Sequence, residues 1–174
     1  INSLREVFFM PVHGLSNGAQ PVMGFNYGAG NKKRLLDALK IGVLIAATIL
    51  LVGMLLFLFF PAQLLGIFND SAEMLRIGVP ALRIISVSFL LAGFCIIAGS
   101  VFQAIGNPVY SLIVSVCRQM VVLLPVAWLL SRTGRLELVW WSFPIAEVMS
   151  FTLSTIFLRR TVKSANEVMN SSAD

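Results

Sequence analysis

Charged side chains are scarce in this sequence. Only 12% of the 174 residues are charged, whereas 57% are hydrophobic, and the mean hydropathy is +0.88. A soluble domain is nearer half apolar and a quarter charged. The composition therefore excludes an ordinary soluble domain and predicts an all-α integral membrane protein, a polytopic bundle of transmembrane helices.

Residues that ligate metals or carry out catalysis are also few. The two cysteines, Cys95 and Cys117, lie inside apolar stretches, and His13 is the single histidine. Each thiol is expected to be structural, and no disulfide framework is expected. Without an acidic cluster or a nucleophile–base set, the sequence predicts no metal site, no cofactor and no enzymatic activity.

The net charge of +5 does not indicate a nucleic-acid partner. The basic residues lie at the ends of apolar stretches rather than along one continuous face. That distribution is typical of charges that orient a protein in a membrane.

Five long segments alternate with short polar turns, of which Gly106-Asn107-Pro108 is the clearest. We expect membrane helices over about 2–28, 34–60, 71–105, 108–131 and 137–160, in one unit spanning 1–163. A polar tail over 164–174 is expected to be flexible and cytoplasmic. The chain opens with Ile1 rather than Met, and Arg5 and Glu6 lie just ahead of the apolar run FFMPV. It is therefore expected to be a fragment that begins part-way into a helix.

Basic residues mark one side of the predicted bundle. Lys32–Arg34 and the group Arg159, Arg160 and Lys163 fall on the same side of a five-helix topology. The positive-inside rule makes that side cytoplasmic. Trp128, Trp140 and Trp141 gather near the opposite interface, as an aromatic belt would.

The first helix is unusually rich in glycine and side-chain amides for a membrane span. On a helical wheel one face carries Gly14, Asn17, Gly18, Pro21, Gly24 and Gly28. Such a face forms either a tight seam with another helix or the wall of a cavity, and both alternatives stay open. Pro21 has no N–H for the carbonyl of Asn17, so we expect the helix to kink or open there.

Two charges lie deep inside apolar helices. By residue count Arg118 lies about 15 Å, and Glu147 about 18 Å, above the cytoplasmic side. Each has hydroxyls on its own helix face, and these belong to Ser111, Ser115, Ser150 and Ser154. One interpretation is a polar lining with a proton-responsive carboxylate, and the other is a structural ion pair.

Several stretches resemble the multidrug and toxic compound extrusion (MATE) family. GLSNGAQPVMGFNYGAGNKKR (14–34) resembles its eighth transmembrane helix and the following loop. FQAIGNP resembles the end of the tenth helix, VCRQMVVLLPVAWLL the eleventh, and WWSFPIAEVMS the twelfth, in the style of the MepA-like bacterial branch. The resemblance implies five of the six helices of a C-terminal lobe, in a multi-pass protein of the bacterial plasma (inner) membrane.

The same resemblance implies an antiporter, coupled to H⁺ or Na⁺, that exports organic and often cationic amphiphiles by alternating access. Its partners would be a small-molecule substrate, membrane lipid and the missing N-terminal lobe. No acid occurs between Ile84 and Ile105, where some family members carry one, so proton coupling through this lobe would need Glu147. The candidate residues of the substrate or ion pathway are Asn17, Gln20, Pro21, Asn26, Gln103, Arg118 and Glu147.

Two alternatives remain from the sequence. A lipid-linked polysaccharide flippase of the same superfamily would be expected to line its cavity with more cations than Arg118. A structural membrane domain without transport activity would gain nothing from a proline such as Pro21 at membrane depth.

Overall fold

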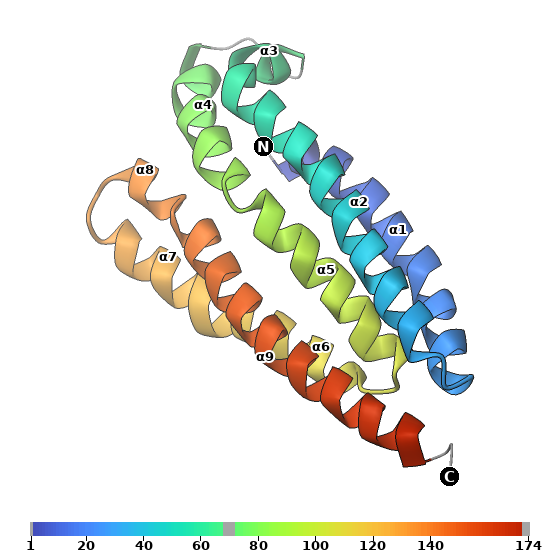
Figure 1. Ribbon diagram of the computed structural model, residues 1–174. Coiled ribbons are helices and arrows are strands. Elements are labelled where there is room, and N and C mark those ends of the chain that lie inside the picture. The colour runs from blue at the N-terminus through green and yellow to red at the C-terminus, as the bar shows by residue number, and fades with distance from the viewer. Residues whose placement is uncertain (1, 68–71, 172–174) are drawn as a thin grey trace.

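The computed structural model describes residues 2–67 and 72–171. Within these ranges every regular element is a helix, and the long helices lie side by side in a bundle (Figure 1). The predicted all-α helix bundle is confirmed.

The first two helices form an antiparallel hairpin. They are α1 (Asn2–Gly28) and α2 (Lys32–Phe59). Gly30 adopts a left-handed φ of 68° in the turn between them, a conformation that favours glycine. The backbone N–H of Arg34 donates to the side-chain oxygen of Asn31 over 3.3 Å, which caps α2.

The predicted helix over 71–105 is bent into two helices. After the short α3 (Pro61–Gly66), the chain forms α4 (Ala72–Ser86) and α5 (Phe89–Ala104), with a bend of 53° between them. Ser86 donates to the carbonyl of Arg83, and Ser88 donates to that of Ile85. These local side-chain bonds compete with the regular backbone ladder where the helix breaks, which is a reason for the bend.

The next crossing contains a π-helical turn that the sequence did not predict. It comprises α6 (Pro108–Val116), the π-helical segment η1 (Cys117–Leu123) and α7 (Leu124–Ser131). The N–H of Leu124 donates to the carbonyl of Gln119, five residues earlier. Pro125 has no N–H and its ring crowds the preceding turn, so the wider turn accommodates the proline without ending the crossing.

The last crossing is longer than predicted. The short α8 (Leu136–Val139) leads into α9 (Ser142–Ser171), so the backbone from 164, where we expected the tail, is helical as far as Ser171. Ala165 is buried in a cluster with Leu35 of α2, and this contact accounts for the extension.

Helix α5 lies at the centre of the bundle and packs against α1, α2 and α9 (Figure 1). Edge-to-face aromatic pairs hold this centre together: Phe8 with Phe57 at 5.4 Å and Phe9 with Phe89 at 5.2 Å between ring centroids. A Cβ added to Gly53 of α2 would lie 2.8 Å from the ring of Phe8. The absence of a side chain at Gly53 therefore lets α1 approach α2 closely.

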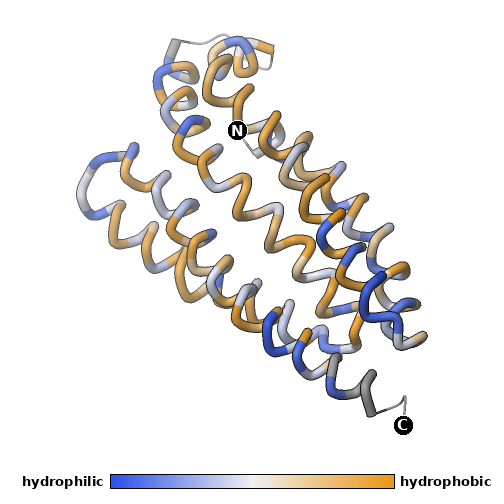
Figure 2. The backbone as a smooth tube through the Cα atoms, viewed as in Figure 1, coloured by the Kyte–Doolittle hydropathy of each residue, from blue (hydrophilic) through white to orange (hydrophobic). Residues whose placement is uncertain are grey.

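Both basic segments lie at the same end of the bundle. The start of α2 and the end of α9 meet there, since Leu39 lines a shallow groove with Arg159 and Lys163. Hydrophilic residues gather at the two ends of the bundle and hydrophobic residues along its length (Figure 2). At the opposite end the guanidinium of Arg132 lies 4.1 Å from the ring centroid of Trp128.

In the described part of the chain, three helical stretches are long and apolar enough to cross a membrane. They are 32–59, 108–131 and 137–165, and the bent pair α4–α5 makes a fourth if it counts as one span. The glycines and amides of α1 keep its hydropathy lower, although it packs alongside α2 and α5. We predicted five membrane crossings, and that of α1 stays a prediction. It rests on the length of α1 and on its place in the bundle.

Candidate functional site

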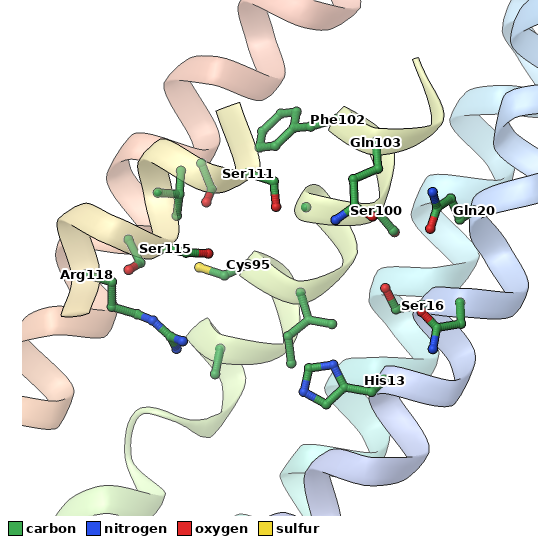
Figure 3. Close-up of a pocket in the computed structure, with 17 residues that line it drawn as sticks. His13, Ser16, Gln20, Cys95, Ser100, Phe102, Gln103, Ser111, Ser115 and Arg118 are labelled. Carbon is green, nitrogen blue, oxygen red and sulfur yellow. The ribbon is translucent and has the colours of Figure 1, made fainter. Parts of the chain in front are cut away.

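A cavity of about 230 Å³ opens between α1, α5, α6–η1 and α9 (Figure 3). Arg118 and Ser115 lie on the wall opposite His13 and Ser16 of α1, and Cys95 of α5 lies between the two walls (Figure 3). The lining is rich in hydroxyls and amides, which are uncommon inside an apolar bundle. Its polar side chains are His13, Ser16, Asn17, Gln20, Cys95, Ser100, Gln103, Ser111, Ser115, Arg118, Ser150 and Ser154.

Helix α1 supplies one polar wall. His13, Ser16, Asn17 and Gln20 recur at intervals of three, one and three residues, which places them on one helix face. The adjoining face carries Val12, which is fully buried in the apolar core. The periodicity of α1 therefore directs its polar side chains into the cavity while its apolar side chains hold the helix in the bundle.

Of the two alternatives for the glycine face of α1, the tight seam forms only at Gly24 among the described residues. A Cβ built at Gly14, Gly18 or Gly28 would meet no described atom within 4 Å. Only at Gly24 does a neighbour come close, the carbonyl oxygen of Ala104 at 3.4 Å. Most of this face is exposed because α2 and α5 pack against the other side of α1.

The expected opening of α1 at Pro21 does not occur. The helix continues without interruption from Asn2 to Gly28, through Pro11 and Pro21. Val12 and Met23, on either side of Pro21 along the helix, are fully buried. Packing on both sides thus compensates for the single backbone hydrogen bond that the proline removes.

The structure brings four of the seven candidate residues together. Asn17, Gln20, Gln103 and Arg118 all line the cavity. Pro21 and Asn26 do not line it. The amide nitrogen of Asn26 donates to the carbonyl of Val22 over 2.8 Å, within its own helix. Glu147 also lies outside the lining, although its partner Arg118 belongs to it.

Arg118 and Glu147 form an ion pair between η1 and α9. Nη1 of Arg118 donates to Oε1 of Glu147 over 2.7 Å, which confirms the pairing suggested by their matched depths. The arginine side chain is 41% exposed, but that of the glutamate only 11%. The pair therefore presents its guanidinium to the cavity and keeps its carboxylate behind it.

Three buried polar atoms beside this pair have no hydrogen-bond partner among the described residues. They are Oε2 of Glu147, Oγ of Ser150 and Oγ of Ser154. A buried polar group left without a partner costs roughly 1–3 kcal/mol. Because both serines line the cavity, a polar occupant of the cavity is the natural partner for their hydroxyls.

The sequence reasoning did not select every lining residue. It treated His13 only as a possible metal ligand. Ser16 received no role. His13, Ser16 and Gln20 recur along one helix face, and this polar pattern predicts the wall, whereas the glycine pattern of the same helix does not.

A sequence profile described as MatE matches residues 1–129. The multidrug export protein MepA of Staphylococcus saprophyticus is 28% identical over 149 residues, which are 84% of this chain and 33% of that protein. The solved structure of the MATE multidrug transporter DinF-BH has a TM-score of 0.82 and 35% identity, and the match covers 90% of this chain and 35% of that one. An inward-facing multidrug resistance MATE transporter has a TM-score of 0.87 at 22% identity, over 95% of this chain and 39% of that one. The chain spans about a third of the length of the curated relatives that it matches.

Proposed function

The chain belongs to the MatE family, and from that premise we propose that it forms most of the C-terminal lobe of a small-molecule exporter. The observation that carries the proposal is a hydroxyl- and amide-lined cavity within an apolar helix bundle. Relatives that match most of this chain are named as multidrug export or multidrug resistance proteins. A cavity of this polarity is what a transporter needs to hold a solute that lipid would exclude.

We infer the membrane orientation from the basic end of the bundle. The start of α2 and the end of α9 lie together and carry two basic groups, Lys32–Arg34 and Arg159, Arg160 and Lys163. We place this end, with the C-terminus, on the cytoplasmic side of a bacterial plasma membrane. The tryptophans and Arg132 near α7 and α8 then lie at the outer interface.

We assign the exposed glycine face of α1 to the space between this lobe and a second lobe of the transporter. Gly14 and Gly18 have open space around them, and neighbouring Asn17 lines the cavity. The other lobe would be contributed by sequence outside this chain, as the length of the relatives suggests. Alternating access would then arise from movement of one lobe against the other.

Export is proposed to be driven by an inward gradient of H⁺ or Na⁺. Within this lobe we assign Glu147 to holding Arg118 rather than to binding the coupling ion. The reason is that Glu147 does not line the cavity and that Oε1 is already bound to Arg118. The coupling carboxylate is therefore expected in the other lobe.

The test uses the full-length protein that carries this sequence, reconstituted in liposomes with a fluorescent organic cation. An imposed H⁺ or Na⁺ gradient is expected to drive the dye against its concentration gradient, and a matched ionophore should abolish that movement. Absence of gradient-driven transport in folded protein would refute the antiport. Loss of the gradient dependence in Glu147→Gln, with dye binding and stability unchanged, would refute the assignment of Glu147.

A further inference from the structure

The charge that the cavity presents to a solute differs in sign from the charge of the substrates expected for this family. Among the described residues that line the cavity, Arg118 alone carries a full charge. Its partner carboxylate lies behind it, with the side chain only 11% exposed. A cationic group entering the cavity would meet the guanidinium before it met the carboxylate.

The bond between Arg118 and Glu147 leaves donor capacity free. A guanidinium has five N–H donors in a planar fork, and the single described bond from Arg118 uses Nη1. With 41% of its side chain exposed, Arg118 can offer further donors to the cavity. A planar carboxylate is the acceptor that this fork fits best.

The side of the cavity next to the ion pair offers two more donors. The hydroxyls of Ser150 and Ser154 are buried, have no described partner and belong to residues that line the cavity. They lie four residues apart and therefore on the same face of α9, the helix that also carries Glu147. A hydroxyl can donate to an anionic oxygen, so these groups complement the arginine.

Resting on the proposed export function, we propose that this cavity binds the carboxylate of an amphiphilic substrate, with Arg118, Ser150 and Ser154 as donors. The site thereby selects zwitterionic or anionic amphiphiles over cations that lack an acidic group. At about 230 Å³ the cavity accommodates the acidic end of such a molecule rather than a whole drug, for which pockets of roughly 300–1,000 Å³ are usual. The apolar remainder would lie in the space beside α1.

A matched pair of dyes tests this inference. Rhodamine 123 is the methyl ester of rhodamine 110, so the two molecules differ only in whether the carboxyl group is free. Binding of each to the purified full-length protein is followed by fluorescence anisotropy. The acid is expected to bind about tenfold more tightly than the ester, because charge-assisted hydrogen bonds are lost on esterification.

Two variants assign the preference to the named residues. Arg118→Gln combined with Glu147→Gln removes both charges, so that neither is left unpaired, and should abolish the preference for the acid over the ester. Ser150→Ala combined with Ser154→Ala removes two hydroxyls without a partner. It should therefore keep or raise the thermal stability and lower the preference for the acid over the ester.

The outcomes are distinct. Equal binding of acid and ester by the wild type would overturn the inference, as would a preference that survives in both double variants. Either result, with gradient-driven transport intact, would leave the proposed export function standing. If folded wild-type protein transports neither dye and no other organic cation, the export function itself fails.

Discussion

Nη1 of Arg118 lies 2.7 Å from Oε1 of Glu147, although the two residues are 29 positions apart in the sequence. The contact joins the π-helical turn η1 to the second turn of α9. Because the arginine borders the cavity and the glutamate does not, their two charges contribute differently to the protein. The glutamate depends on the arginine for its neutralisation, whereas the arginine can also be solvated from the cavity.

This asymmetry predicts unequal effects of removing the two partners. Arg118→Ala leaves a buried carboxylate alone and is expected to cost up to about 3 kcal/mol, at the lower end of values for buried pairs. Glu147→Ala is expected to cost less, because the guanidinium can turn toward the cavity. Combining Arg118→Ala with Glu147→Ala should recover much of the loss. Melting temperatures in detergent measure all three, and strictly additive losses in the double variant would disprove the coupling.

Two glycines on neighbouring helices should respond in opposite ways to alanine. A Cβ at Gly53 would lie 2.8 Å from the ring of Phe8, so Gly53→Ala should lower the melting temperature. A Cβ at Gly18 meets nothing within 4 Å, so Gly18→Ala should be neutral or stabilising, by up to about 1 kcal/mol of helix propensity. If Gly18→Ala destabilised the protein as much as Gly53→Ala, the glycine face of α1 would be packed rather than open.

The topology predicts opposite accessibilities for two turns. Cysteines introduced at Lys33 and at Thr133, in a background with Cys95 and Cys117 changed to alanine, should react with a membrane-impermeant maleimide from opposite sides. A cysteine at Arg159 should react from the same side as one at Lys33. Labelling of Lys33 and Thr133 positions from one side would contradict the orientation.

Much of this architecture could be predicted from sequence because it follows from local rules. The apolar lengths and turn residues predicted the positions of the long helices, and residue counts from their ends placed Arg118 and Glu147 at matching depths. Residues at matching depths can form a contact once their helices are neighbours, and so the pair could be predicted.

Other features depend on tertiary partners that no local pattern names. The small residues of α1 fit a packed seam or an open face equally well, and only the placement of α2 and α5 decided between them. The bend between α4 and α5 arises at serine residues, and the π turn arises before Pro125. Serine and proline occur in other helices without such distortions, so their presence alone does not predict them. The wall made by His13, Ser16 and Gln20 became a site because α5 and α9 face it.

The most direct test of the central claim is export by the full-length protein with a bulky residue placed in the cavity. Ser115 lines the cavity, whereas its neighbour Val116 does not, and both side chains are exposed. Efflux of ethidium, together with rhodamine 110 and rhodamine 123, is measured from cells that express wild type, Ser115→Trp or Val116→Trp at equal membrane levels. The account predicts that Ser115→Trp lowers export of the preferred dye by about tenfold or more, since filling a site removes the binding on which transport depends, whereas Val116→Trp stays near wild type. Wild-type export by Ser115→Trp would contradict the assignment of this cavity to the transport pathway.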